Sequence, residues 1–293
     1  MNILRPWAAG AAFVLAATGY SLVSQQVTIN REWTAPIDPV RIFENVYYVG
    51  TEDLASYLIT TPQGHVLVDS GVAQNAASII KGIQQLGFKP ADVKYLLTTQ
   101  AHFDHVAAHA ELQRLTGAQV VASVGDAELM ETGGKTDYHF GAPYNFPPVK
   151  VNRRVKDGDT VTIGDAVLTA HLTPGHTQGT TTWVMPVTSG GVPTNVVFVG
   201  STSVNPGVKL VGNTKYPQIA EDFAATFERL KRIKVDVFLT AHLSANGGLE
   251  KIAKLRTGGT PNPFVDPSGY AAYLERSKKA FETELARQRG EQR

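Results

Sequence analysis

The order of short apolar segments in the first half of the chain constrains its fold more than any other feature. Seven segments follow one another as strand, strand, strand, helix, strand, helix and strand: Val46–Val49, Tyr57–Thr60, His65–Asp69, Ala76–Leu86, Val93–Thr99, His105–Leu115 and Gln119–Ala122. The first helix has apolar residues at helical spacing, such as Ile79 and Ile83, and ends at Gly87. Strands that alternate with helices predict an α/β layer structure, in which helices cover a sheet.

The second half repeats this pattern with more strands. Four strands, a helix, a further strand and a charged amphipathic helix are predicted: Val161–Ile163, Val167–Leu172, Thr180–Met185, Val196–Gly200, Ile219–Ile233, Val235–Thr240 and Tyr270–Arg289. The segment Gly133–Pro148 is rich in Gly, Pro and aromatic residues without periodicity, which predicts a functional loop such as a binding flap. Two β-rich halves that each end in helices predict a four-layer αβ/βα sandwich of the α/β class, in a single domain.

The N-terminus has the composition of a secretory signal peptide. Arg5 is the only charged residue before Arg31, and an apolar run over Trp7–Thr18 follows it. That run is shorter than the roughly 20 residues that cross a membrane. We therefore predict a signal peptide over residues 1–24, with an approximate cleavage point, and a mature domain over residues 25–293 in a bacterial periplasm. A buried N-terminal helix or a retained anchor is the alternative.

Charge and cysteine content exclude several classes of function. The 293 residues include 27 Lys and Arg and 26 Asp and Glu, for a net charge of +1, and no block of basic residues occurs. This balance argues against nucleic acid as a partner, and against a membrane as a partner of the mature form. The chain contains no cysteine, which excludes thiol catalysis, disulfides, iron–sulfur clusters and zinc sites built on sulfur. Any site chemistry must therefore use nitrogen and oxygen.

Side chains able to bind a metal follow three predicted strands. The segment Gln100–His105 offers four of them directly after an apolar strand, and His176 and His242 each come just past another strand. Ligands of open α/β sheets bind at the carboxyl ends of the strands, so we expect the three loops to meet at one edge. Imidazole and carboxylate ligands without thiolate suit Zn²⁺, with iron or manganese as alternatives.

The other histidines are not predicted to bind a metal. His105 and His109 have the spacing of a helical zinc motif, but Val106 stands where that motif needs a glutamate. His109 is therefore interpreted as a helix-surface residue or as a support for the ligands. Three histidines without such context are interpreted as structural: His65, His139 and His171.

These motifs resemble the metallo-β-lactamase fold superfamily. Its pattern is His-x-His-x-Asp-His followed by two distant histidines, which Gln100–His105, Thr173–Thr177 and His242 match with one change. The turn Asp69-Ser70-Gly71 also matches the family. The pattern is specific for the fold but not for the substrate.

Two departures from the common pattern indicate which subclass of the superfamily the chain resembles. The strand that carries a metal-bridging aspartate in many members ends here at Ser201, with Ser203 close behind. A serine at that position, in a chain without cysteine, resembles the third subclass of metallo-β-lactamases. Gln100 in place of the first histidine resembles a glutamine-bearing minority of that subclass.

The resemblance implies two Zn²⁺ ions per chain and a set of site residues. The first site would be held by Gln100, His102 and His176, and the second site by Asp104, His105 and His242. Because an amide oxygen is a weaker zinc ligand than imidazole, the first site is expected to be the weaker one. Asp104 would also orient the attacking water as a catalytic residue. Ser201 and Ser203 would bind the substrate carboxylate, with Lys209 and Lys215 as weaker candidates.

The implied reaction is hydrolysis of the β-lactam amide bond by metal-activated hydroxide. The expected substrates are small molecules, namely penicillins, cephalosporins and carbapenems, which would give antibiotic resistance. Two alternatives stay open at this point. One is another hydrolase on the same fold, such as a lactonase or thioesterase, and the other is a zinc-binding periplasmic protein without catalysis. The preferred β-lactam and the oligomeric state do not follow from the sequence.

Overall fold

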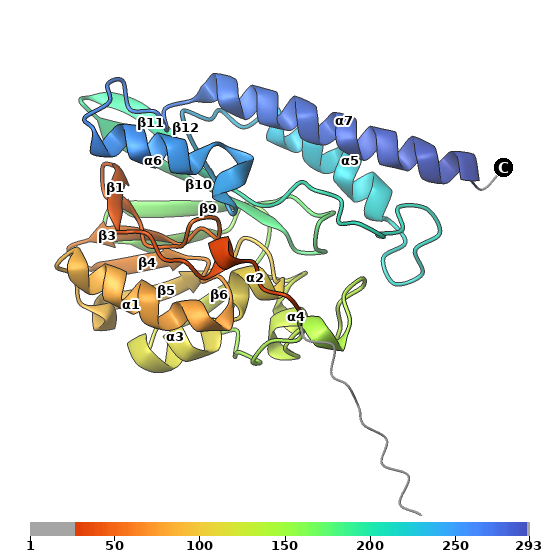
Figure 1. Ribbon diagram of the computed structural model, residues 1–293, viewed down its shortest axis with the longest axis horizontal. Coiled ribbons are helices and arrows are strands. Elements are labelled where there is room, and N and C mark those ends of the chain that lie inside the picture. Colours follow the sequence, from red (N-terminus) through yellow and green to blue (C-terminus); the bar gives the residue numbers. More distant parts are fainter. Residues whose placement is uncertain (1–26, 292–293) are drawn as a thin grey trace, which may run out of the picture.

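The computed structural model describes residues 27–291 and consists of two facing β-sheets with helices on both outer sides (Figure 1). The layers run helix, sheet, sheet, helix, which confirms the predicted four-layer αβ/βα sandwich. The predicted signal peptide, residues 1–24, lies outside the described residues. Within the described part of the chain, no helix is long and apolar enough to cross a membrane.

The first sheet has seven strands in the order β1 to β7: Val40–Phe43, Val46–Tyr48, Tyr57–Thr61, Gly64–Val68, Val93–Leu97, Gln119–Ser123 and Arg153–Val155. Strands β1 to β4 pair antiparallel, whereas β4 to β7 pair parallel. Parallel neighbours need a crossover, and helices α1 (Ala76–Gln85) and α3 (His109–Thr116) supply two of them. The carboxyl ends of β4, β5 and β6 therefore lie at the same edge.

The second sheet has five strands in the order β12-β11-β10-β9-β8. Their bounds in chain order from β8 are Thr160–Ile163, Ala166–Leu172, Thr181–Ser189, Val192–Val199 and Val237–Thr240. Because β9 and β11 are both antiparallel to β10, and β12 is parallel to β11, the strands β9, β11 and β12 all run in one direction. Their carboxyl ends share one edge of this sheet.

Apolar side chains from both sheets fill the space between them. Trp183, Phe198 and Tyr57 are almost fully buried there, and each such burial stabilises the fold by about 1.5–3 kcal/mol. Two of these aromatic residues, Trp183 and Tyr57, also form hydrogen bonds with backbone near the ends of strands. Trp183 Nε1 donates to the carbonyl of Thr98 at 3.0 Å, and the Tyr57 hydroxyl donates to that of Thr240 at 2.8 Å. The core thus fixes the strand ends from which the predicted ligands project.

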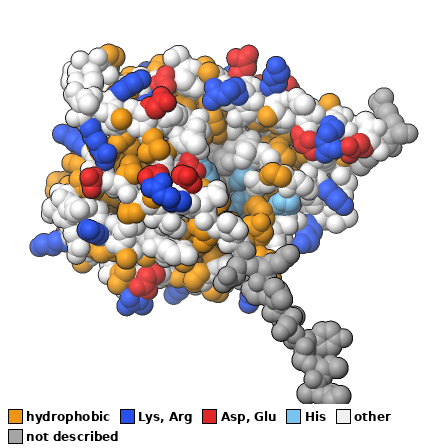
Figure 2. All heavy atoms as spheres, in the orientation of Figure 1, with side chains coloured by type: hydrophobic (Ala, Val, Ile, Leu, Met, Phe, Trp, Pro, Cys, Tyr) orange, Lys and Arg blue, Asp and Glu red, His pale blue; other side chains and the backbone are white. Residues whose placement is uncertain are grey.

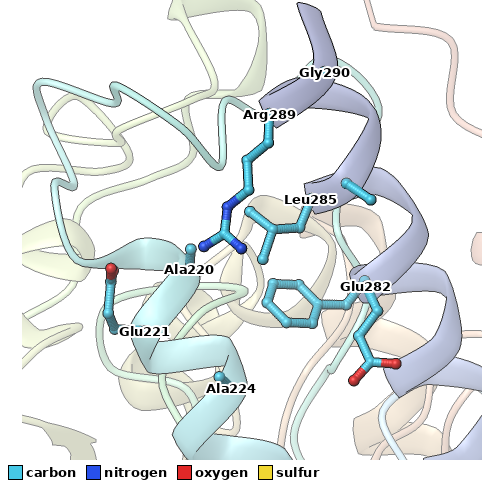
Figure 3. Close-up of a pocket in the computed structure, with 9 residues that line it drawn as sticks. Ala220, Glu221, Ala224, Glu282, Leu285, Arg289 and Gly290 are labelled. Carbon is cyan, nitrogen blue, oxygen red and sulfur yellow. The ribbon is translucent and has the colours of Figure 1, made fainter. Parts of the chain in front are cut away.

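The outer helices of the second sheet are α5 (Ile219–Leu230), α6 (Gly248–Arg256) and α7 (Pro267–Glu291). Helix α7 is mostly exposed, as its charge pattern predicts, but Tyr270, Tyr273 and Phe281 are buried beneath it. A groove between α5 and the last turns of α7 is lined by Ala220, Leu285 and Arg289, among others (Figure 3). It shares no residue with the predicted metal ligands.

The helix predicted over His105–Leu115 is wrong as one element, because it is divided into α2 (Phe103–Val106) and α3. The carbonyl oxygen of His105 accepts hydrogen bonds from the Ser70 N–H at 2.8 Å and from its hydroxyl at 3.2 Å. A continuous helix would need that carbonyl for the N–H of His109. The turn after β4 therefore breaks the helix next to the predicted ligands.

Several short elements were not predicted. They are β1, β7, helix α4 (Ala127–Glu131), helix α6 and five 3₁₀ turns: Arg31–Trp33, Ala73–Asn75, Pro90–Asp92, Ala142–Tyr144 and Leu243–Ala245. Each has too few residues for apolar periodicity to be recognised, except α6, in which only Gly248 and Ile252 are buried. The predicted flap, Gly133–Pro148, contains only one of these 3₁₀ turns.

Candidate metal centre

The predicted ligands come from strand ends that meet at one edge of the sandwich. The segment Gln100–His105 follows β5 in the first sheet, whereas His176 follows β9 and His242 follows β12 in the second. Figure 2 shows histidine side chains in a hollow between the two halves of the molecule, with hydrophobic side chains beside them. The fold therefore places both sets of loops around one depression.

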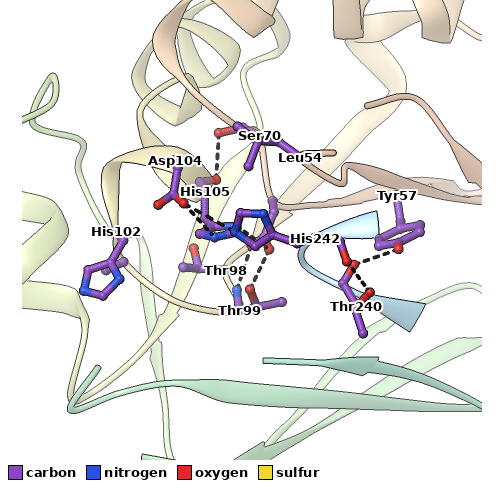
Figure 4. Close-up of polar contacts among 12 residues, drawn as sticks. Leu54, Tyr57, Ser70, Thr98, Thr99, His102, Asp104, His105, Thr240 and His242 are labelled. Carbon is purple, nitrogen blue, oxygen red and sulfur yellow. Dashed lines mark hydrogen bonds and ion pairs between the residues drawn. The ribbon is translucent and has the colours of Figure 1, made fainter. Parts of the chain in front are cut away.

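Asp104, His105 and His242 form a cluster whose ligand atoms all lie within 4.8 Å of one another. Asp104 Oδ2 is 3.4 Å from His105 Nε2 and also 3.4 Å from His242 Nε2. Figure 4 shows the three side chains pointing toward one another, with His102 to one side. One carboxylate and two imidazoles are a donor set that binds Zn²⁺.

The electrostatics of this cluster favour a cation. Burial lowers the pKa of His242, but hydrogen bonds to Asp104 and Asp53, with their negative charges, raise it to about 10. For Asp104, burial raises the pKa, but His105 and His242 hold it well below its usual range. Two ionised carboxylates around His242 thus stabilise positive charge. A divalent cation would compete with the proton for this place.

His102 and His176 form a second pair beside this cluster. His102 Nδ1 and His176 Nε2 face each other at 3.0 Å, although His102 is in a loop after a strand of the first sheet and His176 is in a loop after a strand of the second. The other nitrogen of His176, Nδ1, is 2.7 Å from the carbonyl oxygen of Ser203. Because a carbonyl only accepts, His176 Nδ1 carries the proton and Nε2 offers its lone pair. Burial lowers the pKa of His176 well below its usual value, so the ring is neutral.

Four buried polar atoms around these residues have no hydrogen-bond partner within residues 27–291. They are Gln100 Oε1, His102 Nε2 and both ring nitrogens of His105. Nearby carboxylates do not complete hydrogen bonds with them: Asp137 Oδ2 lies 3.4 Å from His102 Nε2, Asp104 Oδ2 lies 3.4 Å from His105 Nε2, and Asp69 Oδ2 lies 3.7 Å from His105 Nδ1. An unpaired buried polar atom costs about 1–3 kcal/mol. Their concentration at one edge, with nitrogen and oxygen donors, fits a zinc centre.

Gln100 is 1% exposed and lies on the turn that carries His102. Its position agrees with the predicted first site, but its assignment as a ligand stays a prediction. Asp104, His105 and His242, which were assigned to the second site, are brought together directly.

Asp126 is a support that the sequence did not suggest. Its carboxylate accepts hydrogen bonds from the Ala101 N–H at 2.9 Å, from the Thr177 hydroxyl at 2.8 Å and from the Gly179 N–H at 2.9 Å. Burial raises its pKa to about 6. It joins the loop after β5 to the loop after β9, and so fixes His102 relative to His176. No local motif marks this residue.

Asp69 supports the same edge from the end of β4. It lies in the left-handed region, with φ 57°, and accepts hydrogen bonds from the N–H and the hydroxyl of Thr99 at 2.8 and 2.5 Å. Burial raises the pKa of Asp69 to about 6. The family-like turn Asp69-Ser70-Gly71 thus orders the start of the ligand loop.

Ser201 and Ser203 lie next to the first site. Their hydroxyl oxygens are 3.0 Å apart, and the Ser203 hydroxyl is 3.3 Å from His176 Nδ1. Lys215 Nζ lies 3.4 Å from the carbonyl oxygen of Asp137, in the loop that covers this side. The backbone carbonyl of Lys209 accepts a hydrogen bond from the side-chain amide of Asn213 at 3.0 Å. The role of all four in binding a substrate stays a prediction.

His109 is not a helix-surface residue, because it is 1% exposed. Its ring lies between the hydroxyls of Ser70, 2.7 Å from Nδ1, and Thr98, 3.3 Å from Nε2. Burial lowers its pKa to about 3, so it is neutral. It supports the turn beneath the ligand loop, in line with the second interpretation. His65 is also buried, and its ring packs edge-on against Phe88.

A continuous series of ring contacts connects His102 to His242. Neighbouring centroids are 4.5–6.1 Å apart along the series His102, Phe140, Tyr144, Phe103, Trp33 and His242. Phe140 and Tyr144 belong to the predicted flap, whereas Trp33 belongs to the N-terminal segment. Aromatic faces of this kind pack against apolar parts of a ligand.

The fold and this edge define a class of proteins: αβ/βα sandwiches that carry a histidine–carboxylate metal centre at the carboxyl ends of their strands. Residues 50–242 match the family described as the Metallo-beta-lactamase superfamily, and the chain belongs to it. By that membership and by its β-lactamase neighbours, the chain is classed as a hydrolase.

Solved β-lactamases resemble the chain over most of their length. The native FEZ-1 metallo-beta-lactamase from Legionella gormanii is 42% identical, with a TM-score of 0.85 over 87% of this chain and 98% of that one. The class B3 di-zinc enzyme LRA-12, from an Alaskan soil metagenome, is 37% identical, with a TM-score of 0.84 over 88% and 98%.

Curated sequence relatives resemble it over a shorter part. The N-acyl homoserine lactonase AttM of Agrobacterium fabrum is 29% identical over 152 residues, which cover 42% of this chain and 56% of that protein. The chain spans about half the length of the curated relatives it matches.

Proposed function

We propose that this chain is a zinc-dependent β-lactamase of the third, cysteine-free subclass, which hydrolyses the amide bond of penicillins, cephalosporins and carbapenems. The observation that carries the proposal is the pair of histidine clusters at one sheet edge, without cysteine, and with Ser201 and Ser203 beside His176. The resemblance to FEZ-1 over 98% of that enzyme supports it.

Two zinc ions fit the donor atoms available. Gln100, His102 and His176 would hold the first, and Asp104, His105 and His242 the second. Zinc with three protein ligands lowers the pKa of a bound water to about 7 and polarises a carbonyl, which is the chemistry that amide hydrolysis needs.

The chain's own residues would position the reactants. Asp104 is ionised, and its carboxylate, which faces His105 and His242, can accept a hydrogen bond from the attacking water and so orient it. The hydroxyls of Ser201 and Ser203, which contact each other at 3.0 Å, would donate hydrogen bonds to the carboxylate of a bicyclic β-lactam when it binds. Phe140 and Tyr144 would cover the apolar side of the substrate and exclude water from the edge.

We further propose that the first site binds zinc more weakly than the second. The first site offers neutral donors, and the proton of His176 is held by a backbone carbonyl. The second site contains the ionised Asp104, and Asp53 adds a further negative charge. Coulomb attraction for a divalent cation is therefore stronger at the second site.

Residues 1–24 have the pattern of an export signal, and we propose that the mature protein acts in the periplasm. A β-lactam reaches its targets through that compartment, so hydrolysis there would protect the cell. Fractionation with antibodies to the mature domain would test this. Recovery with the cytoplasmic fraction would contradict it.

The function is tested by steady-state hydrolysis of a penicillin, a chromogenic cephalosporin and a carbapenem, with and without a chelator. We expect turnover of all three, lost with the chelator and restored by zinc. A lactonase, which the relationship to AttM makes the second candidate, would instead open an N-acyl homoserine lactone. Turnover of the lactone without turnover of any β-lactam would contradict the proposal.

A further inference from the structure

We propose that Asp53 is the positioning residue of His242, and that Trp33 of the N-terminal segment holds Asp53 in place. This inference rests on the proposed zinc centre. It adds a residue that was not among the predicted ligands, and it connects the second site to a segment far away in the sequence.

The contact between Asp53 and His242 is short and directional. Asp53 Oδ2 lies 2.8 Å from His242 Nδ1, the ring nitrogen that faces away from Asp104. A carboxylate only accepts here, so His242 donates from Nδ1 and directs Nε2 toward Asp104 and His105. Metal-binding histidines characteristically donate their second ring N–H to a carboxylate or carbonyl, which fixes the tautomer and the ring orientation.

Asp53 is itself fixed by several contacts. Its Oδ1 accepts from the Ser244 N–H at 3.0 Å, and its backbone carbonyl accepts from the Leu243 N–H at 2.8 Å. Leu54 forms an isolated bridge with His242. The turn after β2 therefore forms hydrogen bonds with the loop after β12 at His242 itself and at the two residues that follow it. The side chain of Asp53 is 16% exposed, so most of it is enclosed by these contacts.

Trp33 connects the N-terminal segment to the same oxygen. Its Nε1 donates to Asp53 Oδ2 at 3.2 Å, and its ring lies 6.1 Å from that of His242. The carbonyl of Trp33 accepts from the side-chain amide of Asn75 at 2.9 Å, which anchors the tryptophan on the first sheet's helix layer. Asp53 Oδ2 thus accepts hydrogen bonds from both Trp33 Nε1 and His242 Nδ1. This arrangement leaves the carboxylate a single orientation toward His242.

The roles of the two oxygens explain why an amide cannot replace this carboxylate. Asp53→Asn puts an NH₂ group either against the N–H groups of His242 and Trp33 or against the Ser244 N–H. Either choice sets donor against donor, and the negative charge is lost as well. Replacement of such supporting residues typically weakens metal binding by about 10–100-fold.

The test uses full-length mature protein freed of metal and titrated with Zn²⁺ against a chromophoric chelator. The titration is repeated in the His176→Ala background, which removes a ligand of the first site. In both backgrounds we expect Asp53→Asn to weaken the second site about 10–100-fold. Trp33→Phe keeps the ring but loses the Nε1 donor, and we expect a smaller loss at the same site.

Glu52→Gln is the matched control, because Glu52 is the neighbouring acid and pairs with Arg31 rather than with a ligand. We expect its zinc affinities to equal those of the wild type. Unchanged second-site affinity in Asp53→Asn would overturn the inference. So would equal losses at both sites with a lower unfolding temperature of the metal-free protein, since that pattern indicates a general structural role. Failure of the wild type to bind zinc would overturn the proposed function itself.

Discussion

The two proposed zinc sites at the edge of the sandwich have similar predicted ligands but different surroundings. In the first site the proton of His176 is held by the carbonyl of Ser203, a neutral acceptor, and the third predicted ligand is the neutral Gln100. In the second site His242 is held by the carboxylate of Asp53, and Asp104 contributes a charge directly. The two proposed sites therefore differ in the negative charge around them. This difference in charge predicts that the second site binds zinc more strongly than the first.

Loss of the charged ligand is expected to have the largest effect. Asp104→Asn keeps the volume but removes the negative charge and the acceptor that faces His105 and His242. We expect kcat/KM for a chromogenic cephalosporin to fall by about 10²–10⁴-fold, the usual contribution of a group that handles a proton in the reaction. Asp165→Asn, at an exposed hairpin position, is the control. Activity of Asp104→Asn within a few-fold of wild type would contradict the unequal roles of the two sites.

Asp126 joins the turn that carries His102 to the loop that carries His176, so we expect its replacement to affect the proposed first site more than the second. Asp126→Asn leaves an NH₂ group against an N–H of Ala101 or Gly179, or against the Thr177 hydroxyl. We expect the free energy of unfolding of the metal-free protein to fall by about 1–3 kcal/mol, measured by denaturant titration. First-site zinc affinity should fall more than second-site affinity. Equal losses at both sites would show that Asp126 does not distinguish them.

Gln100→His is expected to strengthen the proposed first site and so to reduce the difference in zinc affinity between the two sites. Imidazole binds zinc more strongly than an amide oxygen, so we expect the first-site affinity to rise and the two binding steps to draw together. Zinc stoichiometry in dilute metal, measured after equilibrium dialysis, reports this change. If the stoichiometry stays at the wild-type value, Gln100 is not a ligand of the first site.

The prediction for His109 concerns the pH dependence of stability rather than metal binding. Its pKa is about 3 in the folded chain, against an ordinary value near 6.5 when unfolded. The unfolded state therefore binds the extra proton first, and the stability that neutral His109 contributes is lost as pH falls from 6.5 toward 3. As the pH falls from 6.5 toward 3, we expect the free energy of unfolding to decrease less in His109→Gln than in the wild type. Parallel curves for the two proteins would contradict the buried neutral assignment.

The general fold could be predicted because its determinants are local. Apolar periodicity marked the strands and helices, and the loops after Thr99, Leu172 and Thr240 followed from strand direction. The break between α2 and α3 was missed because its cause, the Ser70 contact to the His105 carbonyl, joins residues far apart in the sequence.

The supporting residues of the site were hidden for the same reason. Asp53 and Asp126 sit in turns where acids are common, and their partners lie 189 residues away at His242 and 51 residues away at Thr177. No spacing rule connects such positions before the sheets face each other. The chemistry-bearing residues were visible because they cluster after strands, whereas the groups that orient them were not.

We propose that one edge of the sandwich carries two zinc sites of unequal affinity and that the stronger site alone supports hydrolysis. The most direct test of this proposal is a zinc titration of the metal-free mature protein while hydrolysis of a chromogenic cephalosporin is followed. We predict that activity appears with the first equivalent of zinc, bound at Asp104, His105 and His242. Activity that appears only with the second equivalent would contradict the account.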